Sequence, residues 1–155
     1  MLSARKANIE DAKFLFLLRN EDGVRKFFWD QKPVKWQDHL SWLEAVLHGN
    51  QKKIYIIEKD KTPIGQVRFD IEDENAEISI SISSKFHGQG YGTEALKESQ
   101  EKFIKECENI KEIHAHIKQE NNASTKVFKK IGYTETNETQ FKGNPCISML
   151  YNVKK

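Results

Sequence analysis

The sequence has few cysteines, few prolines and no long apolar run, and each shortage excludes a class of protein. Its two cysteines, Cys107 and Cys146, lie far apart and form no CxxC pair. This argues against a zinc site or a disulfide framework and predicts a cytoplasmic protein. No stretch approaches the roughly 20 apolar residues that a membrane span needs, and the first five residues do not read as a signal peptide.

Neither sign of charge dominates the chain. The 25 basic and 23 acidic residues leave a formal net charge of +2, which gives no reason to expect a nucleic acid partner. The 155 residues contain no repeat, no low-complexity tract and no linker rich in Pro, Gly or Ser. We therefore expect a single domain over residues 1–155, long enough to bury about two-thirds of its unfolded surface.

The first half of the chain predicts a strand and two helices, followed by strands. Leu2–Ala7 reads as a strand, and Asn8 is placed to cap a helix that ends in a polar break at residues 19–23. A second helix is predicted from an apolar stripe and is expected to end at Gly49; the stripe consists of Trp36, Leu40, Leu43 and Leu47. Strands at 54–57 and 64–71 come next, and Glu77–Ser83 alternates between apolar and polar residues.

The second half adds two helices and three strands. Helices are predicted from about Thr93 to Glu108 and over Ala123–Ile131, separated by a strand at Glu112–Ile117. Tyr133–Asn137 and Cys146–Val153 read as a closing hairpin. The predicted fold class is therefore α+β: a mixed, mostly antiparallel central sheet of about seven strands flanked by four helices.

Three alternating glycines, Gly88, Gly90 and Gly92, separate a predicted strand from a predicted helix. Glycine lets backbone amides approach an anion closely, and a helix N-terminus adds further free donors. On the residues alone, a phosphate-binding loop and a purely structural glycine turn are equally supported. The spacing does not fit a GxGxxG dinucleotide motif, because Thr93 stands where the third glycine would be, and GxxxxGK[ST] is absent.

Residues 76–96, AEISISISSKFHGQGYGTEAL, resemble the acetyl-coenzyme A site of the GCN5-related N-acetyltransferases (GNAT). A second motif, Asn121–Ser124 followed by FKKIGY at 128–133, resembles the closing motif of that family at the expected separation. The resemblance covers essentially the whole chain. It implies the GNAT fold, acetyl-coenzyme A as acetyl donor, and direct sequential transfer to a primary amine, without a metal.

The resemblance also implies which residues hold the donor. Amides of the loop would grip the pyrophosphate: His87, Gly88, Gln89, Gly90, Tyr91, Gly92 and Thr93. A bulged strand would present the backbone of Ile80, Ser81 and Ile82 to the thioester, and Asn121 and Ser124 would lie beside the pantetheine arm. Phe128 departs from the family, which often has tyrosine there as acid for the leaving thiolate. A water, or the hydroxyl of Tyr133 or Ser124, is then left for that role.

A general base is needed to deprotonate the incoming amine. Glu77, on the strand before the loop, is one candidate. His114 and His116, on the neighbouring strand opposite its apolar face, are the others, because histidine titrates near the operating pH. The sequence leaves the choice among them open. Neither cysteine has partners that would make it a nucleophile, so no covalent enzyme intermediate is expected.

The acceptor side resembles acetyltransferases that act on nucleotide-linked 4-amino sugars. This resemblance assigns six candidate substrate-binding residues: Arg19, Asn20, Arg25, Phe28, Trp29 and Arg68. The arginines would pair a diphosphate and the aromatic rings would stack on uracil. Protein N-termini, polyamines and aminoglycosides are alternative acceptors, and a non-catalytic acyl-coenzyme A-binding module is the alternative outside the enzymes. A strand-rich edge near the C-terminus is compatible with a homodimer.

Overall fold

A computed structural model describes residues 2–153 and builds them around one open sheet. The strand order is β1-β2-β3-β4-β5-β8-β6, and β7 pairs with β8. Neighbouring strands run antiparallel, except that β4 and β5 run parallel. The strands are β1 Leu2–Lys6, β2 Lys52–Lys59, β3 Thr62–Glu72, β4 Asn75–Ile82, β5 Glu112–Lys118, β6 Thr134–Glu135, β7 Gln140–Phe141 and β8 Asn144–Asn152.

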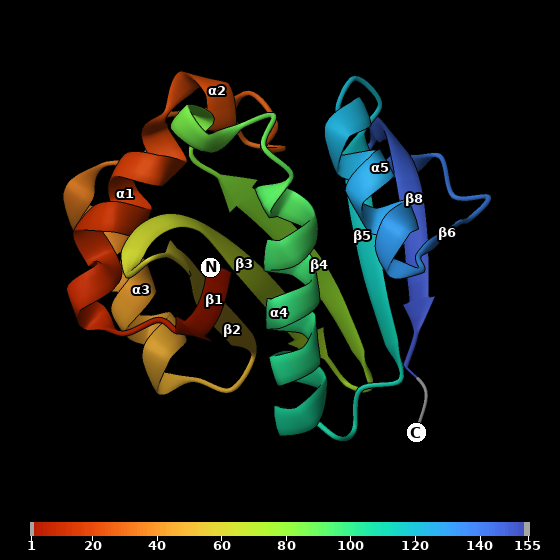
Figure 1. Cartoon of the computed structure of the whole chain (residues 1–155), viewed down its shortest axis with the longest axis horizontal. Coiled ribbons are helices and arrows are strands. Elements are labelled where there is room, and N and C mark those ends of the chain that lie inside the picture. The colour runs from red at the N-terminus through yellow and green to blue at the C-terminus, as the bar shows by residue number, and fades with distance from the viewer. Residues whose placement is uncertain (1, 154–155) are drawn as a thin grey trace.

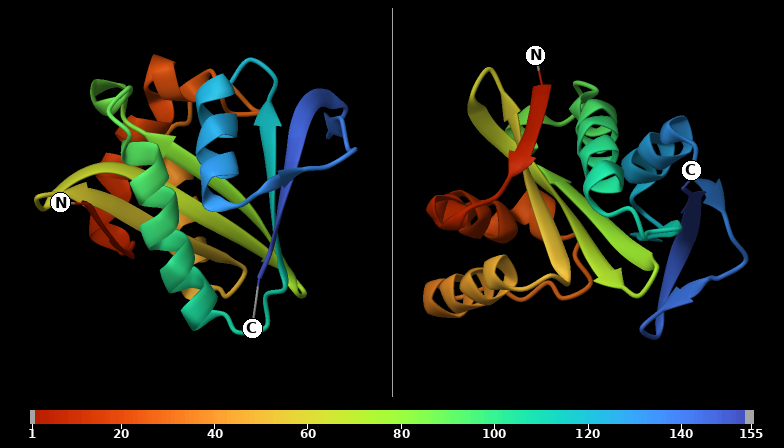
Figure 2. Two further views of the ribbon diagram at one scale, coloured as in Figure 1. Left: turned by 45° about the vertical axis from the view of Figure 1, so that its right-hand side comes forward. Right: turned by 90° about the horizontal axis from the view of Figure 1, so that it is seen from below.

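Helices cover both faces of this sheet (Figures 1 and 2). One face carries α1 (Ala12–Asn20) and α3 (Trp36–His48), and the other carries α4 (Tyr91–Glu106) and α5 (Asn122–Ile131). The four-residue helix α2 (Asp22–Arg25) follows α1, and short 3-10 turns lie at Ile9–Asp11 and Ser84–Phe86. The predicted α+β class with a mostly antiparallel sheet is confirmed; α2 and the two-residue strand β7 were not expected.

The larger core lies between the sheet and α4 and α5. Phe69 of β3 stacks on Phe103 of α4 with ring centroids 3.9 Å apart, and both side chains are fully buried. A smaller core, under α1 and α3, includes Leu15, Leu43 and Ile56. Because side chains alternate along each strand, the two cores share the same strands, and the sheet is held from both sides.

The apolar stripe predicted for α3 is partly wrong. Trp36 and Leu47 are 38% and 36% exposed, whereas His39 is buried between Leu43 and the end of the first 3-10 turn. The His39 ring donates Nε2–H to the carbonyl oxygen of Ala12 at 3.1 Å, so its polar atom is satisfied inside the helix layer. A polar residue with a local partner thus takes the place that an apolar residue was expected to fill.

Two predicted boundaries also move. Helix α4 begins at Tyr91 rather than at about Thr93, because Gly90 adopts a left-handed conformation (φ 79°) and ends the loop there. At the C-terminus, β6 pairs with β8 as predicted. The first strand of that pair is shorter than predicted, because β6 spans only Thr134–Glu135, and the tight turn at Lys142 and Gly143, with φ of 51° and 80°, joins β7 to β8.

Gly65 allows β3 and β4 to approach closely. A Cβ added there would lie 2.4 Å from the carbonyl oxygen of Ser81, and that atom belongs to the backbone. We therefore expect Gly65→Ala to lower the free energy of unfolding by about 1–3 kcal/mol, as overpacking usually does. Urea unfolding measures the change. Gly49→Ala is the control, because its nearest contact would be an ordinary 3.4 Å; equal stability of both variants would contradict the close approach.

Candidate active site

The sheet splits between β4 and β5. The two strands pair only over Asn75–Glu77 and Glu112–His114, and beyond that point they diverge (Figure 1). On its other side β4 pairs with β3 in unbroken register up to Ile82. The bulge predicted in β4 is therefore absent from this pairing, and the split arises because the parallel ladder stops at Glu77.

The divergence leaves backbone groups of β4 unpaired. The Ser83 N–H donates to Ile64 of β3 at 2.8 Å, so alternate residues Ile80 and Ile82 direct their backbone groups toward β5. No β5 residue pairs with either of them in the ladder. The Ile82 carbonyl accepts a hydrogen bond from His87 Nε2 at 2.6 Å, which ties the glycine loop to the end of the strand.

A groove of about 580 Å³ occupies the split. Eleven of the thirteen predicted donor-binding residues line it; Gln89 and Thr93 do not. These lining residues are Ile80, Ser81, Ile82, His87, Gly88, Gly90, Tyr91, Gly92, Asn121, Ser124 and Phe128. One groove thus joins the loop, the open edge of β4 and the start of α5, as a long acyl-carrier substrate requires.

The glycine loop has the conformation of an anion site. Gly88 and Gly90 have φ of 77° and 79°, and a Cβ added at either would meet nothing within 4 Å. Gly90 is the N-cap of the 16-residue helix α4, and no side chain accepts a hydrogen bond there as a cap. The first amides of α4 are therefore free to bind an anion. Gly92 has another role, since its α-carbon lies against Val127 of α5.

Three further motif residues, Asn121, Ser124 and Phe128, also line the groove. The Asn121 side chain caps α5 by accepting from the Ser124 N–H at 3.3 Å, while both residues also line the groove. Phe128 is 2% exposed and packs edge-on against Tyr133 at 4.9 Å. The Tyr133 hydroxyl donates to Gln100 at 2.6 Å and does not face the groove, so it is not placed to protonate a leaving group there.

Glu21 joins the loop region to the first helices. Its carboxylate accepts from the Ser83 hydroxyl at 3.0 Å and from the Ser84 N–H at 2.9 Å. Gly23 lies so close to Ser84 that a Cβ on Gly23 would fall 2.3 Å from the Ser84 hydroxyl oxygen. The segment that follows α1 is thus fixed against the loop at the mouth of the groove.

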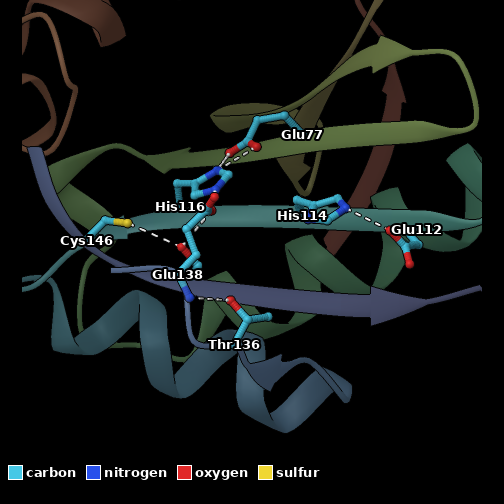
Figure 3. Close-up of polar contacts among 8 residues, drawn as sticks. Glu77, Glu112, His114, His116, Thr136, Glu138 and Cys146 are labelled. Carbon is cyan, nitrogen blue, oxygen red and sulfur yellow. Dashed lines mark hydrogen bonds and ion pairs between the residues drawn. The ribbon is translucent and has the colours of Figure 1, made fainter. Parts of the chain in front are cut away.

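The Glu77 carboxylate lies where β4 and β5 part, and His116 of β5 faces it (Figure 3). The distance from His116 Nδ1 to Glu77 Oε1 is 2.8 Å, and His116 Nε2 contacts Glu138. Burial acts to lower the pKa of His116, but the hydrogen bonds and charges of Glu77 and Glu138 outweigh it and raise that pKa above 6.5. Both acidic partners favour the imidazolium ion.

The third base candidate lies outside the groove. The His114 side chain points along β5 to Glu112, with Nε2 3.1 Å from Oε1, and it lines a separate hollow beyond Glu77 (Figure 3). Glu77 and His116, in contrast, both line the groove.

Three lysine–aromatic pairs also line the groove. Each ammonium lies over or beside a ring at 5.0–5.8 Å: Lys26 with Phe27, Lys118 with Trp29, and Lys142 with Phe141. We call these six residues the basic-aromatic rim; all of them line the groove. The rings also contact one another, with Trp29 and Phe141 centroids 5.4 Å apart.

Of the six predicted acceptor residues, three line the groove: Phe28, Trp29 and Arg68. The other three make local contacts. Arg19 donates to the Asp30 carbonyl oxygen at 2.6 Å and lies over the Phe28 ring. The Asn20 side chain makes two hydrogen bonds to the backbone of Val34. Arg25 forms an ion pair with Asp22. The sequence reasoning missed Lys26, Lys118, Phe141 and Lys142, because isolated lysines and hairpin residues carry no motif.

A family model described as an acetyltransferase (GNAT) domain matches residues 2–134. The chain belongs to this acetyltransferase family. Members of this family use acetyl-coenzyme A as the acetyl donor. The free amides at the start of α4 and the open edge of β4 fit such a molecule. Within residues 2–153, no helix is long and apolar enough to cross a bilayer.

Two proteins with similar sequences and one solved structure illustrate what the chain is similar to. An uncharacterized protein of Methanocaldococcus jannaschii, MJ1062, is 29% identical over 85% of this chain, which spans only 28% of that protein's length. Acetyltransferase PseH of Campylobacter jejuni is 20% identical over 82% of this chain and 79% of its own. The solved structure of RimL, a ribosomal L7/L12 α-N-protein acetyltransferase in complex with coenzyme A, is 17% identical with a TM-score of 0.82, covering 98% and 95% of the two chains.

A carboxylate placed in the loop tests the anion site of this acetyltransferase. We expect Gly90→Asp to weaken coenzyme A binding about tenfold or more, because it adds a negative charge where free amides converge. Calorimetry measures the affinity. Gly143→Asp is a matched control, since Gly143 has φ 80° and equally open surroundings but lies in the β7–β8 turn. If both variants bind coenzyme A as the wild type does, the loop is not the anion site.

The raised pKa of His116 links folding to pH. Its stabilising effect is fully present below the unfolded pKa of about 6.5 and is lost as pH rises through the higher folded pKa. The stability advantage of the wild type over His116→Gln should therefore be larger near about pH 6 than near about pH 9 in urea unfolding. His48→Gln, at the exposed end of α3, should follow the wild type. An advantage that does not change with pH would refute the ion pairing.

Proposed function

We propose that the chain transfers the acetyl group of acetyl-coenzyme A directly to the primary amine of a nucleotide-linked amino sugar, such as the 4-amino group of a UDP-linked sugar. The observation that carries the acceptor class is the basic-aromatic rim. Its ammonium groups suit a diphosphate, and its rings suit a nucleobase. The chain is also 20% identical to the acetyltransferase PseH over most of both chains.

The charge of the rim separates the alternative acceptors. Lys26, Lys118 and Lys142 would repel a polyamine or an aminoglycoside, which carry several positive charges of their own. A protein N-terminus is the second candidate acceptor. RimL, a ribosomal L7/L12 α-N-protein acetyltransferase, has a similar fold. A peptide N-terminus, however, lacks the diphosphate that the three ammonium groups of the rim suit.

Glu77 is the residue we assign as general base. Both nitrogens of His116 face carboxylates, so its imidazolium has no lone pair to accept a proton. His114 lies outside the groove. The Glu77 side chain is 32% exposed and lines the groove, so one of its oxygens can take the proton of the incoming ammonium, directly or through a water.

The rest of the reaction relies on the backbone of β4. The deprotonated amine attacks the thioester carbonyl, a C–N bond forms, and an unpaired amide at Ile80 or Ile82 is placed to stabilise the negative oxygen. The nitrogen then gives up its second proton to water, the C–S bond breaks and the thiolate leaves. A thiol pKa of about 8.5 makes the thiolate an acceptable leaving group near neutral pH. Water can therefore supply its proton, and Phe128 does not prevent turnover.

A panel of amines tests the proposal. Acetyl-coenzyme A is offered with UDP-4-amino sugars, N-terminal peptides, spermidine and aminoglycosides, and released thiol is measured. We expect turnover with the nucleotide sugar. Turnover with peptides alone would contradict the acceptor assignment, and thiol release with none of the amines would favour the binding-only module.

One lysine of the rim gives a sharper test. Lys118→Gln should raise KM for the UDP-linked sugar roughly fivefold while leaving KM for acetyl-coenzyme A unchanged, because about 1 kcal/mol of attraction to the diphosphate is lost. Lys111→Gln is the matched control, since Lys111 lies just before the opposite end of β5 and pairs with Glu74. An equal effect of both changes would mean that the rim does not bind the acceptor.

A further inference from the structure

His116 is held between two carboxylates that come from different elements (Figure 3). Its Nδ1 lies 2.8 and 2.9 Å from the two oxygens of Glu77 on β4. Its Nε2 contacts Oε1 of Glu138, which lies in the segment between β6 and β7. An ionised carboxylate only accepts hydrogen bonds, so both nitrogens of the ring must donate. The arrangement therefore selects the imidazolium form of His116.

The surroundings keep this ring in place. The Phe141 ring stacks on His116 with centroids 4.2 Å apart, and the His116 side chain is only 10% exposed. The titratable groups that face it are Glu77 from β4 and Glu138 from the β6–β7 segment; on β5 itself, His114 and Lys118 are the neighbours on the same face. A cation in this position is compensated on both sides by negative charge.

Glu138 is itself oriented by its neighbours. The Ser148 hydroxyl of β8 donates to Glu138 Oε1 at 3.1 Å, and the Glu138 N–H donates to the Thr136 hydroxyl at 3.3 Å. The Glu138 side chain is 57% exposed and does not line the groove. Its one contact toward the site is His116, so any effect on the reaction has to pass through that ring.

We propose that Glu138 is a positioning residue for acetyl transfer: it holds His116 as a cation, and His116 in turn fixes the Glu77 carboxylate at the point where β4 and β5 part. The proposal rests on the function assigned to Glu77 above. Glu138 also lies beyond residue 134, where the match to the family model ends. One partner of the contact, Glu138, thus lies outside the matched part of the chain, and the other two lie within it.

Removal of the Glu138 charge has a specific consequence. In Glu138→Gln the amide oxygen can still accept from Nε2, but the second negative charge is lost, so His116 gives up its proton at lower pH. Above that pH the neutral ring holds Glu77 less firmly. Because the side chain at position 138 does not line the groove, we expect the substitution to leave the binding of acetyl-coenzyme A unchanged.

Two measurements on the full chain test the proposal. The first follows the imidazole Cε1–H signal of His116 by NMR as pH rises, with His116→Gln used to assign the signal. The second measures kcat, KM and the pH profile with acetyl-coenzyme A and the amine that the panel identifies. The variants are Glu138→Gln and Glu138→Asp, and the matched control is Glu135→Gln, an exposed glutamate of β6 on the same segment.

We expect Glu138→Gln to lower the titration midpoint of His116 and to reduce kcat about tenfold, with KM for acetyl-coenzyme A unchanged. The alkaline limb of the pH profile should move in the same direction as the midpoint. Glu138→Asp should restore both properties in part, and Glu135→Gln should change neither.

Two results would overturn the proposal. An unchanged midpoint in Glu138→Gln would show that the two side chains do not interact in solution. A lowered midpoint with unchanged kcat would show that the contact does not serve the reaction. If the wild type releases no thiol with any amine, the proposed function fails and the positioning role fails with it; the titration then separately decides whether Glu138 holds His116 as a cation.

Discussion

The candidate active site depends on one constraint, the early end of the parallel ladder between β4 and β5. Three residue pairs hold the strands together, and the last of them is Glu77 with His114. Past this pair the backbone of β4 has lost a partner on one side while keeping β3 on the other. The groove, the unpaired backbone amides of β4 and the location of Glu77 at the split all follow from that single break.

The break also explains how the polar groups of the site are arranged. On the face of the sheet toward α1 and α3, side chains from β4, β5 and the β6–β7 segment converge on His116. On the opposite face the apolar side chains of the same strands join the larger core under α4 and α5. The strand alternation thus gives the site a rigid apolar support directly behind its ionisable groups.

The sequence predicted the fold class, the family and the glycine loop, because these depend on local chemistry. Alternating isoleucines in β4 and left-handed glycines before α4 leave a clear pattern in the chain. It did not predict that His39 is buried or that Trp36 is exposed, since a hydrogen bond to Ala12 overrides hydropathy there. The Glu138–His116 contact and the basic-aromatic rim were also out of reach, because they bring together segments that lie far apart in the chain, and single lysines and glutamates normally lie in solvent.

The carboxylate of Glu21 links the two halves of the groove mechanically. It binds the turn that precedes the glycine loop and belongs to the junction of α1 and α2, which leads into Lys26–Trp29. Gly23 packs against the same turn, where an added Cβ would lie 2.3 Å from the Ser84 hydroxyl oxygen. The position of the α1–α2 junction relative to the glycine loop is therefore held by one charged side chain, and the two cannot move apart without leaving the Ser84 amide without its acceptor.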